Sequence, residues 1–179
     1  SAFLADNLEV KRGDRLLDMF TGSGAIGLSA AKDADKVVGV DISPIAIQCA
    51  KENAIRLGLH SKVDFRQGDL WATVKQEEEF DVITANPPLL PAHPENILEI
   101  AVADSPEMEV TRAFLVGCRQ HLSKDGKVFM AFSNACQVSV GDPLQFITKV
   151  AEEANLELSV KADWDVGYEV YRILQLKGI

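Results

Sequence analysis

The stretch Arg15–Gly27 reads RLLDMFTGSGAIG and decides the fold. Its first five residues, Arg15–Met19, are mostly apolar and are expected to form a strand, and Ala25–Ala34 is expected to form a helix. Between the two lie Gly22 and Gly24, which allow a tight turn. A strand that passes through a glycine turn directly into a helix begins a βαβ unit, so this stretch predicts a parallel sheet.

The rest of the chain continues the alternation of strands and helices. Ser43 and Pro44 are a suitable cap and first position for a second helix, which Gly58 is expected to end. Strands are predicted at Lys36–Val40, Val63–Gln67, Phe80–Thr84 and Lys127–Phe132, and helices at Glu107–His121 and Asp142–Ala154. Two final strands, Leu156–Lys161 and Tyr168–Leu176, leave room only for a hairpin-like connection at Asp163–Gly167 and are therefore expected to be antiparallel.

Composition limits the class of protein. The chain has 179 residues, of which 47% are hydrophobic and 25% are charged, as expected for one soluble globular domain. It contains no apolar run of about 18 residues and no signal-like start, and its three cysteines make neither a disulfide framework nor a zinc site; we therefore expect a cytoplasmic protein. A net charge of −9 argues against a dedicated nucleic-acid binder.

Asp18 distinguishes between the ligands that a glycine turn of this kind can bind. Gly22, Gly24 and Gly27 match G-x-G-x-x-G, a pattern that dinucleotide-binding folds share. A dinucleotide would place its pyrophosphate over the turn, where the carboxylate of Asp18 would repel it. S-adenosylmethionine (SAM) has no phosphate and carries a sulfonium and an ammonium group against one carboxylate. Asp18 therefore favours SAM over NAD.

Asp41 follows the second predicted strand, at the sheet edge where open α/β folds bind ligands. Its carboxylate can accept hydrogen bonds from the two hydroxyls of a ribose. The alternative is a cap for the following helix, a role that Ser43 fills better. Because both NAD and SAM contain a ribose, Asp41 does not separate them.

Taken together, these motifs resemble the class I SAM-dependent methyltransferases, in particular the HemK-like and small methyltransferase group. Asp18 and the glycine turn resemble motif I, D-x-G-x-G-x-G, with Phe20 in place of the first glycine. Asn86-Pro87-Pro88 (NPP), directly after the fourth predicted strand, resembles motif IV of enzymes that methylate amino and amide nitrogens. In that pattern Asp69 accepts from the adenine amino group, and Leu70 or Trp71 would cover the ring. The cofactor-binding residues implied are Asp18, Phe20, Thr21, Gly22, Gly24, Asp41, Ile42, Asp69, Leu70 and Asn86.

The resemblance, which spans about Asp6–Leu176, implies a single catalytic domain over residues 1–179. Its fold would be Rossmann-like: seven strands, mostly parallel with an antiparallel C-terminal strand, and helices on both faces. Residues 1–13 would form a lead-in, with a short helix at Phe3–Leu8 over the SAM site. Relatives often carry a separate substrate-recognition domain, and we expect none within this sequence. Either a partner subunit recognises the substrate, or the sequence is the catalytic part of a longer protein.

Asn-Pro-Pro suits methyl transfer to nitrogen. The lone pair of an amide or aromatic amine is delocalised, so the site must fix the NH₂ group and aim it at the methyl carbon. The side-chain oxygen of Asn86 and the carbonyl of Pro87 can accept its two N–H bonds and stabilise the positive charge that develops. Pro88, like Pro87, has a fixed φ that stiffens the loop. This chemistry requires no metal.

The loop after the motif bears on the substrate. Relatives usually have an aromatic residue where this chain has Leu89, and stacking on a flipped base is worth ~1–3 kcal/mol. Leucine offers only apolar contact, which argues against a nucleobase. His93 is a second candidate for contact with the substrate, although a lone loop histidine is commonly a surface residue.

Three hypotheses follow. The first is a SAM-dependent N-methyltransferase that acts on a protein glutamine, in a release factor or a ribosomal protein, and releases S-adenosylhomocysteine. The second is a base methyltransferase of rRNA, tRNA or DNA, which would need a local basic patch such as Arg56, Lys62 and Arg66; a small-molecule methyltransferase stands beside it. The third is a non-catalytic SAM- or dinucleotide-binding module, against which the intact Asn86-Pro87-Pro88 argues. No membrane partner is expected.

Overall fold

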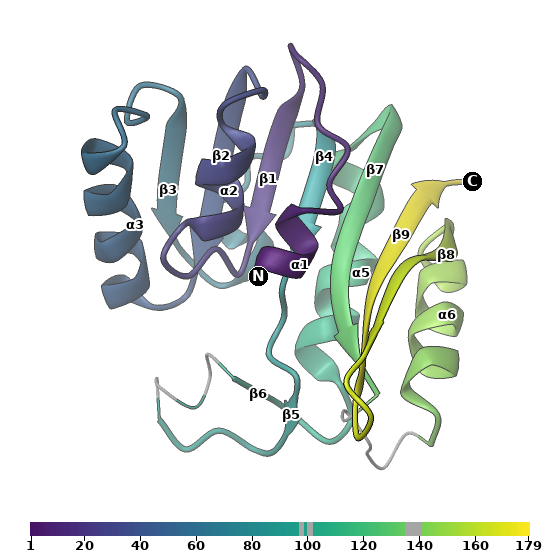
Figure 1. Ribbon diagram of the computed structural model, residues 1–179. Helices are drawn as coiled ribbons and strands as arrows, with labels where there is room; N and C mark the ends of the chain where they lie inside the picture. Colours follow the sequence, from purple (N-terminus) through teal and green to yellow (C-terminus); the bar gives the residue numbers. More distant parts are fainter. Residues whose placement is uncertain (97–98, 100–101, 135–140) are drawn as a thin grey trace.

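The computed structural model describes residues 1–96, 99, 102–134 and 141–179. A seven-stranded sheet forms its centre, in the order β3-β2-β1-β4-β7-β9-β8 (Figure 1). The strands are β1 Arg15–Met19, β2 Lys36–Asp41, β3 Val63–Gln67, β4 Phe80–Ala85, β7 Leu122–Ser133, β8 Leu156–Asp165 and β9 Val170–Gly178. The helices are α1 Ala2–Ala5, α2 Ala25–Ala30, α3 Pro44–Arg56, α5 Glu109–His121 and α6 Pro143–Glu153.

The strand pairing confirms the predicted sheet. Strands β3, β2, β1, β4 and β7 pair in parallel, whereas β9 pairs antiparallel with both β7 and β8. The last hairpin is longer than predicted, because β8 continues to Asp165 and its turn contains Gly167 at φ 89°. The paired β7 starts at Leu122 instead of Lys127, with a register shift opposite Phe80 and Val82.

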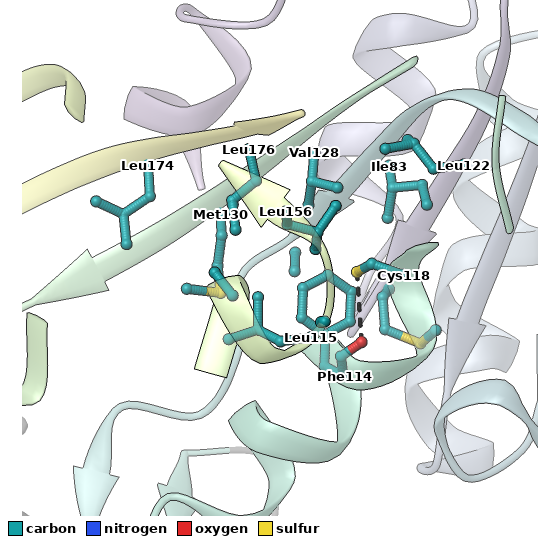
Figure 2. Close-up of a cluster of buried hydrophobic side chains, with 14 of the residues drawn as sticks. Ile83, Phe114, Leu115, Cys118, Leu122, Val128, Met130, Leu156, Leu174 and Leu176 are labelled. Carbon is teal, nitrogen blue, oxygen red and sulfur yellow. Dashed lines mark hydrogen bonds between the residues drawn. The ribbon is translucent and has the colours of Figure 1, made fainter. Parts of the chain in front are cut away.

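Alternating side chains bury the two faces of the sheet in separate clusters. Leu17 of β1 faces a cluster that includes Phe114 of α5 and Ile147 of α6. Its neighbour Leu16 faces the opposite cluster, which includes Leu4 of α1 and Ile26 of α2. Helices therefore cover both faces, as expected for strands that are buried on both sides. Figure 2 shows part of the first cluster, where Phe114 lies among aliphatic side chains of the sheet.

The helix boundaries follow from local capping. The Ser43 side chain accepts a hydrogen bond from Ala46 N at the start of α3, as predicted, and Gly58 at φ 69° follows its end. Helix α6 starts after Asp142, whose side chain accepts from Leu144 N. Helix α2 is shorter than the predicted Ala25–Ala34 and ends at Ala30, where turn residues lead into β2. Helix α5 begins at Glu109, two residues later than predicted.

Three elements were absent from the prediction. A short 3-10 helix spans Leu70–Thr73, and a second, two-stranded parallel sheet pairs β5, Leu90–Pro91, with β6, Ala103–Asp104. In Figure 1 this small sheet lies beyond the ends of the main strands, below β4 and β7.

None of the described helices is long and apolar enough to span a membrane. Cys49 and Cys118 are free, and Cys136 lies outside the described residues.

Candidate functional site

A pocket of about 520 Å³ opens where the parallel strands end. Its volume lies in the range of small-molecule sites. Of the residues that the sequence singled out, those that line it are Phe20, Thr21, Gly22, Asp41, Ile42, Asp69, Leu70, Asn86, Pro88 and His93. Asp18, Gly24, Pro87 and Leu89 lie outside this lining.

The glycine turn between β1 and α2 forms one wall of the pocket. Phe20, Gly22 and Gly24 all have positive φ angles, of 60°, 54° and 80°. Such angles cost little for glycine but about 1–2 kcal/mol for a residue with a Cβ, so Phe20 holds a strained position. Its ring packs against Phe114 of α5, with centroids 5.9 Å apart, and this contact helps to keep it there.

Asp18 lies beneath the turn, so the expectation that its charge faces the ligand needs correction. The side chain is fully buried, and its oxygens accept hydrogen bonds from Thr21 Oγ1 at 2.6 Å, Gly27 N at 2.9 Å and Thr84 Oγ1 at 2.8 Å. Burial raises the pKa of this carboxyl, and the three hydrogen bonds act in the opposite direction. Asp18 therefore ties the turn to α2 and β4, and its side chain does not line the pocket.

Asp41 lies beside the start of α3, but the cap of that helix is Ser43, as the sequence predicted. Asp41 lines the pocket, and its Oδ2 accepts from Gly22 N at 2.8 Å while its Oδ1 accepts from Ser43 N at 2.9 Å. These backbone donors fix the orientation of the carboxylate. Each oxygen keeps further acceptor capacity toward the pocket.

The loop after β3 contributes Asp69 and Leu70 to the pocket wall. Leu70 has a positive φ of 47°. The sequence allowed either Leu70 or Trp71 to cover a bound ring, but Trp71 does not line the pocket and packs instead on α5. The covering role is therefore open to Leu70 alone.

Asn86, Pro87 and Pro88 directly follow the end of β4. Asn86 lines the pocket, and its Nδ2 lies 3.4 Å from Ser1 Oγ, which also lines it. Residue 1, which precedes α1, therefore borders the site near the place expected for the lead-in helix. Pro87 and Pro88 are buried, and Leu89 N donates to Val102 O, so the loop is held against the small sheet.

One wall of the pocket, formed by β6 and the start of α5, contains residues that the sequence did not predict to be functional. Asp104, Ser105, Glu109 and Val110 line the pocket. Asp104 is almost fully buried and accepts from Val110 N and from both N and Oγ1 of Thr111, so it caps α5. An Asp-Ser pair ahead of a predicted helix is a capping signal. Nothing local to it indicates that this cap faces the end of β4, far back in the chain.

The proposed basic patch is largely occupied by internal contacts. Arg66 donates to both oxygens of Glu78 and to Asp64, and the bond to Glu78 raises its pKa. Lys62 donates to the carbonyls of Ala31 and Ala34. Only Arg56 of the three is exposed at the surface, where it donates to a neighbouring asparagine on its own helix. Of the three, Arg66 has its charge paired with the carboxylates of Asp64 and Glu78.

The pocket is lined by several acidic side chains. Among the described lining residues are four carboxylates, Asp41, Asp69, Asp104 and Glu109, and neither Lys nor Arg. Such a lining disfavours a pyrophosphate and favours a ligand with positive charge. No group of three or more His, Cys, Asp or Glu side chains suited to a metal ion occurs among the described residues.

Comparison with known proteins identifies the family. The family model "Methyltransferase small domain" matches residues 1–154. The chain belongs to this family. A release factor glutamine methyltransferase from Koribacter versatilis is 45% identical over 75 residues, which cover 41% of this chain and 26% of that protein. Similar proteins from several other organisms carry the same name.

Solved structures share the fold of this methyltransferase small domain. The E. cuniculi Mtq2–Trm112 complex, described as methylating a translation termination factor, has a TM-score of 0.72 at 20% identity over 99% of this chain and 94% of that chain. A 16S rRNA methyltransferase from Thermus thermophilus, solved with AdoMet and guanosine, has a TM-score of 0.69 at 21% identity over 94% of this chain and 38% of that chain. The curated relatives are longer, and the chain spans 26% to 45% of their length.

Proposed function

We propose that this protein is a SAM-dependent N-methyltransferase that methylates a side-chain amide of a protein, a glutamine of the release-factor type. One observation carries the proposal: a single pocket joins the glycine turn, Asp41 and Asp69 to Asn86 of the Asn-Pro-Pro motif. The names of the relatives support the reaction and its acceptor, although the matches cover less than half of each relative.

The lining residues suit SAM. Asp41 would accept from the ribose hydroxyls and Asp69 from the adenine amino group, with Leu70 against the ring. The four carboxylates and the lack of Lys and Arg in the described lining match a ligand that carries a sulfonium and no phosphate. When bound, SAM supplies an electrophilic methyl group.

Asn86 and Pro87 would bind the acceptor nitrogen. The Nδ2 group of Asn86 faces Ser1, so its Oδ1 is placed on the other side of the amide, where it can accept an N–H bond. A second acceptor, the carbonyl of Pro87, would complete the orientation of the NH₂ group. Both acceptors would stabilise the positive charge on nitrogen as the new C–N bond forms and the methyl–sulfur bond of SAM breaks, which releases S-adenosylhomocysteine. The methylated nitrogen would then lose one proton to water, a step that needs no charged base.

A protein acceptor fits this site better than RNA. Arg66 and Lys62 are held by internal partners, and Asp104 and Glu109 add negative charge to the pocket wall. Phosphates beside a flipped base would meet these acids. A neutral amide in a protein loop avoids this repulsion, and Leu89 does not supply the stacking that a base would use.

Binding and transfer can be tested separately. Calorimetry should show binding of SAM and S-adenosylhomocysteine and none of NAD; NAD binding without a SAM signal would refute the cofactor assignment. SAM with a radiolabelled methyl group is then incubated with a cell lysate, and the products are digested with protease or RNase. Label released by protease and absent with Asn86→Ala supports the proposal, whereas RNase-sensitive or small-molecule label would identify another acceptor.

Substrate recognition is expected to involve more than this domain. The chain spans less than half of its curated relatives, and one solved neighbour is a complex with a second protein. We propose that a further domain or a partner subunit presents the acceptor protein in the cytoplasm. Co-purification of a labelled acceptor with a second polypeptide would test this.

A further inference from the structure

Gly117 occupies an unusual place for a glycine, in the middle of α5. A glycine in a helix interior costs about 1 kcal/mol relative to alanine, so its presence calls for a packing reason. A Cβ at this position would lie only 2.1 Å from Nε1 and 2.4 Å from Cε2 of Trp71. The indole therefore rests directly on the backbone of α5, in a space that any other residue would fill.

Two aromatic neighbours hold the indole of Trp71 in this position against Gly117. It stacks on Phe114 with centroids 5.8 Å apart and planes 8° apart, and on His121 at 5.0 Å and 11°. Its Nε1 donates to Ala113 O at 3.2 Å. Phe114 is itself fully buried in the core cluster of Figure 2, so Trp71 is packed directly against the hydrophobic core.

Trp71 directly follows the two pocket residues of its loop. Asp69 and Leu70 line the pocket, and Leu70 begins the 3-10 helix with a positive φ of 47°. A leucine in this region of φ is strained by about 1–2 kcal/mol and stays there only when its surroundings impose it. The packing of Trp71 on Gly117 restrains the backbone at the residue that directly follows Leu70.

We propose that Trp71, seated on Gly117, is a positioning residue that fixes Asp69 and Leu70 in the geometry needed to bind the adenine end of SAM. The inference rests on the proposed function, since it assumes that SAM occupies the pocket. Trp71 itself does not touch the ligand. It acts by keeping the loop in one conformation, which raises the fraction of molecules that are ready to bind.

The test substitutes Gly117 and Trp71 separately and together. Gly117→Ala displaces the indole, and Trp71→Ala removes it; each should raise the Kd for SAM about tenfold, as expected if the competent fraction falls to about one tenth. The double variant should bind no more weakly than either single variant, because both changes release the same contact. Trp71→Phe, which keeps a stacking ring, should recover most of the affinity. The matched control is Val116→Ala, an exposed neighbour on the same helix, and should bind as the wild type.

Calorimetry separates loop positioning from loss of folded protein. Unfolded protein lowers the binding stoichiometry, whereas a loosened loop raises the Kd at full stoichiometry. In steady-state assays the KM for SAM should rise while kcat at saturating SAM stays near the wild-type value. Unchanged Kd in Gly117→Ala and Trp71→Ala, additive losses in the double variant, or equal losses in Val116→Ala would overturn the inference. Wild-type protein that does not bind SAM would instead refute the proposed function.

Discussion

Replacement of Asp18 by Asn and by Ala separates two roles for this carboxylate. If Asp18 acts through its charge on SAM, both variants lose cofactor affinity. If it acts as a hydrogen-bond acceptor beneath the turn, Asn retains most of the function and Ala does not. The structure supports the second role, because all three donors to Asp18 come from Thr21, Gly27 and Thr84 of the protein itself.

The contacts set the expected magnitudes. In Asp18→Asn the remaining oxygen can still accept from Thr21 and Gly27, and the new amide can donate to Thr84 Oγ1, whose hydrogen can rotate away. Unfolding free energy should therefore change by less than about 1 kcal/mol. In Asp18→Ala the N–H of Gly27 loses its acceptor and a small cavity forms, so we expect a loss of about 2–4 kcal/mol.

Urea denaturation and calorimetry with SAM are the assays. Asp18→Asn should keep its Kd within about threefold of wild type, and Asp18→Ala should weaken binding at least about tenfold. The reasoning is refuted if Asp18→Asn loses affinity tenfold while its stability is unchanged.

The pH dependence gives a second check. Burial raises the pKa of Asp18 in the folded state, so the cost of burying its charge is absent at low pH and is added as pH rises through the folded pKa. The free energy of unfolding of Asp18→Asn should therefore increase relative to that of the wild type as pH increases.

Three further outcomes are expected. Asp41→Ala should weaken SAM binding by about 1–3 kcal/mol in calorimetry, and unchanged affinity would assign Asp41 a purely structural role. Asn86→Ala should lower single-turnover transfer at saturating SAM by ~10²–10³ with little change in Kd, and near-wild-type turnover would contradict the role of the motif. The hydrogen bond from Arg66 lowers the pKa of Glu78 to about 2, so this pair stabilises the fold above the ordinary pKa of a glutamate and its contribution is lost as pH falls toward 2. When acid unfolding of Glu78→Gln is followed by circular dichroism, the loss of stability between about pH 4.5 and pH 2 should be smaller than in the wild type. An acid-unfolding profile identical to that of the wild type would contradict a stabilising role for the pair.

Local sequence is sufficient for the order of the elements and for the edge of the sheet that binds ligands. The apolar runs that form β1 to β4 lie within one residue of their predicted bounds, because strand periodicity and glycine or proline signals are properties of neighbouring residues. Parallel strands place their carboxyl ends together, so the order of strands and helices alone predicts a shared site for Asp41, Asp69 and Asn86. All three line one pocket.

Tertiary packing settles which of these side chains face the pocket and what supports them. The identity of Asp18 does not say whether it points at a ligand or beneath the turn, and donors from three separate elements turn it inward. Asp104 lines the same pocket as Asn86, which precedes it by 18 positions, and Trp71 packs on Gly117, which follows it by 46 positions. Such contacts depend on how α5 packs across the sheet, and packing over these separations leaves no periodic signal in the sequence.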